Sequence, residues 1–239
     1  MTAVNGLVLV TGATSDLGYE LADQLARHGY DLIVTDQDDV DIAAAALAVH
    51  GTDVEPVRAD VRQAGDLELL HRRIVGGPRP VAVAALSAEV GRGYVVDGSL
   101  DAALDVVDLS VRATVRLARL LLTDMVVRGS GRLLLTASAG TELPAVGRAM
   151  YASSTSFLTS FADALHDDLA QSQVSVMALM PSYQLPEDPA EVGVDALVRG
   201  EHQAVRMGVS TLSAMVSLAL RLMPGNLRTL IHQAISTIG

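Results

Sequence analysis

The sequence contains no cysteine, no lysine and no tryptophan, and only 3% of its 239 residues are aromatic. Without cysteine there are no disulfides, no thiol nucleophiles and no thiolate metal sites. All 17 basic residues are therefore arginines. Because a guanidinium stays protonated near neutral pH, arginine cannot carry protons as a lysine amine can. Chemistry that depends on a lysine is excluded for this chain.

Positive charge is scarce relative to negative charge. The chain has 28 acidic residues and a formal net charge of −11. Recognition of nucleic-acid phosphates needs a surplus of basic residues, so this balance argues against nucleic-acid binding. The six histidines are scattered without the spacing of metal ligands, so we expect no metal site.

The chain also lacks long, purely apolar runs. The N-terminus has no basic targeting region and has the pattern of a first strand. The apolar stretch Met207–Met223 is interrupted by serines, a threonine and Arg221, which makes it too polar for a membrane span. We expect a cytoplasmic protein whose residues 207–239 form a C-terminal helical region.

Half of the residues are hydrophobic, which suffices for one large core, and residues 1–239 show no linker or repeat. Apolar runs alternate with helical periodicity, a pattern typical of a parallel sheet covered by helices on both faces. The sequence therefore predicts a single α/β domain, a three-layer, doubly wound parallel sheet of the Rossmann type. The predicted strands are Leu7–Val10, Asp31–Thr35, Val54–Arg58, Val81–Ala85, Arg132–Thr136 and Val174–Leu179. The predicted helices are Asp16–His28, Val40–His50, Leu67–Val75, Leu100–Val127 and Met150–Gln171.

Residues 182–206 interrupt this alternation with several prolines and glycines. The segment follows the last predicted core strand, and ligands of such sheets bind beyond the carboxyl ends of the strands. It is interpreted either as a substrate lid or as a plain connecting loop.

A glycine-rich turn joins the first strand to the first helix. Backbone N–H groups of such a turn bind a pyrophosphate, and the helix dipole favours its charge. Asp36 follows the second strand, where an acceptor for ribose hydroxyls is expected. The candidate cofactor-binding residues of the turn are Gly12, Thr14, Ser15, Asp16, Leu17 and Gly18.

The turn resembles the TGxxxGxG loop of short-chain dehydrogenases/reductases, and Asp60-Val61 resembles the pair that contacts adenine in that family. The resemblance extends over nearly the whole chain. Asp36, with no arginine beside it, would favour NAD over NADP. Asp16 stands where the family has its middle glycine. Its carboxylate either repels the pyrophosphate or points to solvent or caps the helix.

The family's catalytic residues are only partly present. Ser138 matches the catalytic serine and Tyr151 the tyrosine of YxxxK. The lysine position is Thr155 and the asparagine position is Ser110. The Asn-Asn-Ala-Gly motif is reduced to Ala84-Ala85-Leu86-Ser87, and the late Pro-Gly is Pro181-Ser182.

In the family, the lysine lowers the pKa of the tyrosine and holds the nicotinamide ribose. Without it, Tyr151 should remain a neutral phenol that donates hydrogen bonds but is a poor base. We therefore expect no cofactor, or weak NAD(P) binding with NAD preferred. Ser138 and Tyr151 are alternatively an inert pair within the core.

Three functions follow. The first is an enzyme of secondary metabolism that acts on a small apolar metabolite by non-redox chemistry of the cyclase, dehydratase or isomerase type. The second is an NAD-dependent oxidoreductase with a slow or rearranged site. The third is an inactive scaffold or partner of an active relative. Because family members associate through the helices at Leu100–Val127 and Met150–Gln171, we expect a homodimer or homotetramer.

Overall fold

The computed structural model describes residues 6–77, 80–90, 98–139, 149–180, 189–199 and 205–206. They form a sheet of seven strands in the order β3-β2-β1-β4-β5-β6-β7, and the pairings between neighbours are parallel. The strands are β1 (Leu7–Thr11), β2 (Asp31–Asp36), β3 (Val54–Arg58), β4 (Val81–Val90), β5 (Gly131–Ala139), β6 (Val174–Met180) and the short β7 (Val205–Arg206).

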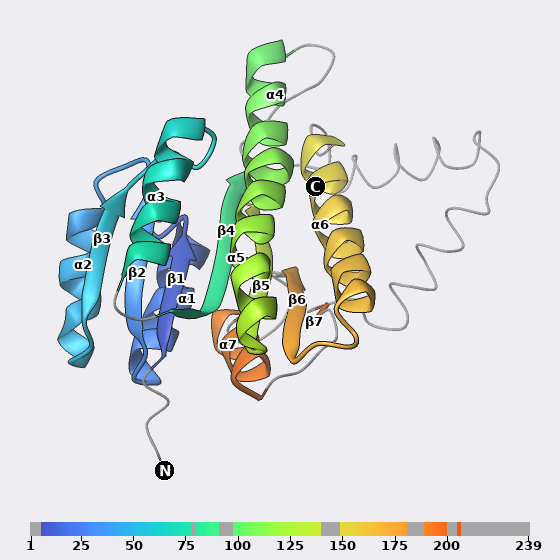
Figure 1. Ribbon diagram of the computed structural model, residues 1–239. Coiled ribbons are helices and arrows are strands. Elements are labelled where there is room, and N and C mark those ends of the chain that lie inside the picture. The colour runs from blue at the N-terminus through green and yellow to red at the C-terminus, as the bar shows by residue number, and fades with distance from the viewer. Residues whose placement is uncertain are drawn as a thin grey trace, which may run out of the picture.

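Helices cover both faces of this sheet (Figure 1). One core lies between the sheet and α1 (Asp16–Arg27), α2 (Val40–Leu47) and α7 (Pro189–Arg199). The other lies between the sheet and α3 (Ala64–Gly76), α5 (Thr114–Arg128) and α6 (Ala149–Asp168). A 3₁₀ turn, η1 (Ala48–His50), follows α2. Helix α4 (Leu100–Val107) continues into α5 through a π-helical turn, η2 (Asp108–Ala113). The predicted three-layer architecture is confirmed.

The strands are apolar on both faces because each face packs against helices. In β1, Val8 and Val10 lie in one core and Leu9 in the other, and all three are fully buried. Such continuous apolar runs are typical of parallel strands with both faces covered. This is why short apolar runs sufficed to locate the six longer strands.

The structure differs from the sequence expectation within residues 182–206. Residues 189–199 form α7, which the sequence did not predict, and Ala190, Val194 and Leu197 are buried in the core shared with α1. This part of the predicted lid is therefore a packed helix. Residues 182–188 and 200–204 lie outside the described residues, as does the predicted helical region 207–239.

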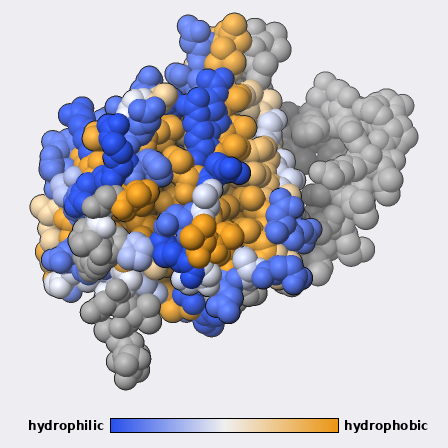
Figure 2. All heavy atoms as spheres, viewed as in Figure 1, coloured by the Kyte–Doolittle hydropathy of each residue, from blue (hydrophilic) through white to orange (hydrophobic). Residues whose placement is uncertain are grey.

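Apolar side chains are exposed on the helices of the face seen in Figure 2. Among the described residues, the large exposed apolar side chains include Leu104 on α4 and Val115, Val126 and Val127 on α5. Association through this face stays a prediction. Among the described residues, no helix is long and apolar enough to cross a membrane.

Candidate functional site

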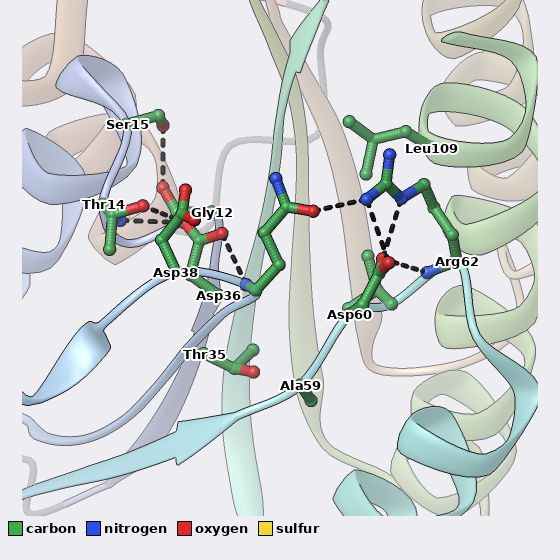
Figure 3. A pocket seen from close by; sticks show the side chains of 12 residues that line it. Gly12, Thr14, Ser15, Thr35, Asp36, Asp38, Ala59, Asp60, Arg62 and Leu109 are labelled. Atoms are coloured by element: carbon green, nitrogen blue, oxygen red, sulfur yellow. Dashed lines mark hydrogen bonds and ion pairs between the residues drawn. The ribbon is translucent and has the colours of Figure 1, made fainter. Parts of the chain in front are cut away.

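The sheet reverses its winding at β1, which has β2 on one side and β4 on the other. In doubly wound folds, ligands bind at this switch point, beyond the carboxyl ends of the strands. A cavity of about 120 Å³, open to solvent, lies there. Its lining comes from the ends of β1, β2 and β3 and from η2 (Figure 3). The lining residues are Gly12, Thr14, Ser15, Thr35, Asp36, Gln37, Asp38, Ala59, Asp60, Val61, Arg62 and Leu109.

The predicted phosphate turn has the geometry that its glycines require. Gly12 has φ +68°, in the left-handed region that favours glycine. A Cβ added to Gly18 would lie 1.9 Å from the carbonyl oxygen of Gly12, so no larger residue fits without a shift of backbone. Ser15 is the N-cap of α1: its Oγ donates to the Gly12 carbonyl (2.7 Å) and accepts from the Gly18 N–H (3.2 Å). The turn is thus closed by its own residues.

Asp16 occupies the first position of α1 and is exposed. Since Ser15 provides the cap, Asp16 does not cap the helix, and the alternative in which it points to solvent agrees with the structure. Its carboxylate still lies in the first turn, at the helix end that would face a pyrophosphate. Leu17 is buried in the core, so only its backbone is available to a ligand.

Asp36 joins the end of β2 to the phosphate turn. One carboxylate oxygen accepts hydrogen bonds from the backbone N–H (3.0 Å) and the hydroxyl (2.6 Å) of Thr14. The other accepts from the backbone N–H of Gln37 (2.7 Å). The two hydrogen bonds from Thr14 use both lone pairs of Oδ2, whereas Oδ1 keeps one for a further donor. The carboxylate is therefore fixed in direction yet remains able to accept from ribose hydroxyls.

Asp60 is held by Arg62, a residue that the sequence motifs did not single out. Arg62 donates from Nε to Oδ1 (2.8 Å) and from Nη2 to Oδ2 (2.9 Å), and its backbone N–H donates to Oδ1 (3.0 Å). These hydrogen bonds hold the pKa of Asp60 below its usual value, and Asp60 in turn raises the pKa of Arg62. The sequence signal was present, since Arg62 directly follows Asp60-Val61.

The same guanidinium also reaches across the cavity. Arg62 Nη2 donates to the side-chain oxygen of Gln37, and the Nε of Arg58 donates to the Gln37 backbone carbonyl (3.0 Å). Gln37 immediately follows Asp36, so two arginines from the end of β3 flank this segment. No arginine adjoins Asp36 along the chain, but two arginines bind its neighbour Gln37.

The predicted catalytic residues lie on the other side of the switch point, on β5, α6 and η2. Ser138 is in β5, one residue before its end, and Tyr151 is in the first turn of α6. The side chains of both lie outside the described part of the structure. Their convergence on a common point stays a prediction.

Thr155 replaces the expected lysine one turn after Tyr151. Its hydroxyl donates to the carbonyl of Ala152 in its own helix (3.1 Å). Ser110 lies in the π-helical turn η2 and is fully buried, and its Oγ has no hydrogen-bond partner in the described part of the chain. π-turns inside α-helices occur frequently at functional sites. The adjacent Leu109 lines the cavity, so η2 contributes to both halves of the site.

The adenosine half of a dinucleotide fits the residues present. Asp36 offers an acceptor, and Thr35 lines the cavity with a buried hydroxyl that has no partner among the described residues. The nicotinamide half has no lysine to bind its ribose. In the described ranges, no cluster of three or more histidine, aspartate and glutamate residues could hold a metal ion.

Similarity to known sequences accords with this geometry. A Streptomyces coelicolor protein whose name describes it as a ketoacyl reductase is 29% identical over 220 residues, which cover 90% of this chain and 82% of that protein. Oxidoreductase UcpA of Salmonella typhimurium is 28% identical over 178 residues, 73% of this chain and 68% of that protein.

Solved structures share the fold. A short-chain dehydrogenase from Sphingobium yanoikuyae in complex with NADPH superposes with a TM-score of 0.74 at 24% identity, covering 91% of this chain and 95% of that one. The bulky-bulky ketone specific alcohol dehydrogenase from Comamonas testosteroni gives a TM-score of 0.75 at 21% identity, covering 93% and 96%. The sequence profile of the family described as short chain dehydrogenase matches residues 6–188. The chain belongs to the short-chain dehydrogenase family.

Proposed function

We propose that this chain is an atypical enzyme of the short-chain dehydrogenase family that acts on a small apolar metabolite without hydride transfer. The hydroxyls of Tyr151 and Ser138 would donate hydrogen bonds to one substrate oxygen and stabilise negative charge that develops there. The proposed chemistry is of the cyclase, dehydratase or isomerase type, in which polarising an oxygen suffices and no electrons are exchanged with a cofactor.

The single observation that carries this proposal is the environment of Thr155. Its hydroxyl is bonded back to the Ala152 carbonyl, and no lysine exists anywhere in the chain. A tyrosine phenol has an unperturbed pKa of about 10 and needs an adjacent positive charge to lose its proton near neutral pH. Tyr151 then remains protonated, which suits a hydrogen-bond donor and does not suit a base.

Weak dinucleotide binding is part of the proposal. Asp16 places a carboxylate in the first turn of α1, and Thr155 offers no cation for the nicotinamide ribose. Unit charges about 4 Å apart repel by about 1 kcal/mol in water and about 4 kcal/mol at intermediate dielectric. Since Asp16 is exposed, the smaller figure applies. We therefore expect binding that is weakened rather than abolished, with NAD preferred because Asp36 remains able to accept from an unmodified ribose.

The second candidate is an NAD-dependent oxidoreductase with a slow site. The geometry of the adenosine half favours this candidate, since Asp36 is hydrogen-bonded to Thr14 and the phosphate turn has the close approach of Gly18 to Gly12. Relatives named as reductases and oxidoreductases support it as well. The two candidates differ in a measurable way: only the second consumes nicotinamide cofactor in proportion to product.

The test uses small ketones and 3-oxoacyl and 3-hydroxyacyl thioesters as probes, each with NADH, with NADPH and without cofactor. Product is followed by mass spectrometry and cofactor by its absorbance. We expect product without cofactor oxidation, and a turnover lowered roughly a hundredfold or more by Tyr151→Phe, the scale seen when one oxyanion donor is lost.

The matched control is Tyr30→Phe, because Tyr30 is buried immediately before β2, at the opposite end of the strand from Asp36. This variant should retain full turnover. Product formation in step with cofactor oxidation would favour the second candidate. Full activity of Tyr151→Phe would remove Tyr151 from the chemistry, and the absence of any product with the wild-type chain would favour the scaffold function.

A further inference from the structure

The cavity at the ends of β2 and β3 is acidic for a site that would take an anionic ligand. Asp36, Asp38 and Asp60 line it, and Arg62 is the one positively charged side chain among its described lining residues. Asp105 and Asp108, on the α4–η2 segment, also act on the Arg62 charge. A nucleotide that enters this cavity therefore meets a negative field that Arg62 alone counteracts.

The orientation of the Arg62 guanidinium is fixed by two strand ends. Nε and Nη2 bind the two oxygens of Asp60 side by side, and Nη2 also donates to the side chain of Gln37 (Figure 3). These bonds all lie at the edge of the planar group, so they leave its flat face and Nη1 for other contacts. The side chain is about one-quarter exposed, which agrees with a group that is anchored along one edge.

The other walls of this part of the cavity are apolar. Val61 comes from the end of β3 and Leu109 from η2, and both line the cavity with Arg62. A flat cation beside two aliphatic side chains suits the π-face of an aromatic base, since a guanidinium stacks well on aromatic rings. Asp36, which lies apart from Arg62 in Figure 3, is then left for the ribose.

We propose that the guanidinium of Arg62 packs against the face of the purine base of an adenine nucleotide, and that Asp60 and Gln37 hold it in position. The inference rests on the proposed function only in that this cavity admits the adenosine half of a dinucleotide. It assigns to Arg62 a role in selecting a base-containing ligand, and it assigns to Asp60 the role of orienting Arg62.

The experiment measures binding of ADP-ribose by calorimetry to the wild-type chain and to Arg62→Ala and Arg62→Lys. We expect about a tenfold loss of affinity in Arg62→Ala. Arg62→Lys should recover only part of it, because an ammonium keeps the charge but has no flat face and cannot bind Asp60 side-on. Ribose 5-phosphate, which has no base, should lose less affinity in Arg62→Ala than ADP-ribose does, because it loses only the favourable charge of Arg62 and no contact with a base.

Arg73→Ala is the matched control. Arg73 on α3 binds Glu55 through Nε and Nη2, in the same side-on arrangement, and does not line this cavity. It should bind ADP-ribose as the wild type does. A thermal melt of each variant verifies that it is folded before its affinity is compared.

Three results would overturn the proposal. Unchanged or tighter binding of ADP-ribose by Arg62→Ala would show that the guanidinium does not contact the base. A loss restricted to 2′-phosphorylated ADP-ribose would assign Arg62 to that phosphate through Nη1. A Kd of the wild type for ADP-ribose above about 1 mM would show that the cavity is not a nucleotide site. None of these readouts depends on Tyr151, so each is separate from a failure of the proposed catalysis.

Discussion

The two halves of the site differ in how their polar side chains are held. At the adenosine half, the side chains of Ser15, Asp36 and Asp60 each take part in two or more hydrogen bonds. Asp36 joins the ends of β1 and β2 through Thr14, and Arg62 joins the ends of β2 and β3 through Gln37. At the catalytic half, Thr155 is bonded to its own helix and the Oγ of Ser110 is buried without a described partner. The first set of residues serves the fold as well as a ligand. The second set contributes few contacts to the fold that the structure describes.

This difference explains how one half can keep its motif while the other loses it. Replacing Ser15 would remove the cap of α1, and replacing Gly18 would force the turn apart, so stability alone retains these residues. Thr155 in place of the family's lysine disturbs neither a helix cap nor a close backbone packing of this kind. A preserved phosphate turn is therefore weaker evidence for cofactor use than a preserved catalytic lysine would be.

The largest effect is expected from Gly18→Ala. The added Cβ would overlap the Gly12 carbonyl, so backbone must move, and we expect a loss of about 3 kcal/mol, or roughly 6–12 °C in Tm. Gly65→Ala is the control, because Gly65 lies exposed in the first turn of α3 and a Cβ there meets nothing within 4 Å. It should be neutral or slightly stabilising. Equal Tm values of the two variants in calorimetry would mean that the close packing of Gly18 against the Gly12 carbonyl does not contribute to stability.

A smaller effect, on affinity, is expected from Asp16→Gly. Removing the exposed carboxylate from the pyrophosphate end of α1 should tighten NADH binding about fivefold, or about 1 kcal/mol. Asp41→Gly is the control, since Asp41 is an exposed acidic residue in the first turn of α2 and does not line the cavity. Both variants lose a favourable helix-dipole contact, so only the affinities should differ. If fluorescence titrations gave equal NADH affinities for Asp16→Gly and Asp41→Gly, Asp16 would not explain the weak binding.

The same variant sharpens the comparison between the halves. Thr155→Lys alone should give less hydride transfer at limiting NADH than the double variant with Asp16→Gly, because Asp16 still weakens cofactor binding. In the Asp16→Gly/Thr155→Lys chain, any hydride transfer to a small ketone should exceed that of either single variant. Ready oxidation of NADH by Thr155→Lys alone would show that the catalytic half was the only obstacle.

The sequence predicted the fold well because parallel strands with both faces covered have a local signature. Val8, Leu9 and Val10 are apolar in succession, and such runs recur in the other longer strands except the edge strand β3, in which Val54 and Val57 are separated by Glu55 and Pro56. Helix α7 was missed because Pro189 and Gly193 read as loop residues. Pro189 begins the helix, where its missing N–H costs nothing, and Gly193 leaves room for Leu179, which would lie 2.5 Å from an added Cβ.

The site was predictable where it is continuous in sequence and not where it is assembled in space. The phosphate turn and Asp36 follow from a spacing that the chain itself fixes. Arg62, Gln37 and Leu109 come together from separate loops and a π-helical turn, and no local pattern of residues announces such a turn. The interaction of Asp36 with Thr14 likewise depends on how β1 and β2 are aligned.

The smallest effect concerns the pH dependence of the Asp60–Arg62 pair. The hydrogen bonds of Arg62 lower the pKa of Asp60, so the folded state gains stability wherever the unfolded carboxylate, with a pKa of about 3.9, is ionised. That gain is lost as the pH falls below about 4 and through the lower pKa of the folded state. We expect the wild type to exceed Arg62→Ala by about 0.5–1 kcal/mol in urea unfolding at any pH between about 5 and 8. The difference should shrink towards pH 3. The Asp23–His50 pair (2.7 Å) is common to both chains, so its titration cancels in the difference. A stability difference that changed between about pH 6 and pH 7 would mean that a group other than Asp60 interacts with Arg62. The orientation of the Arg62 guanidinium would then need another explanation.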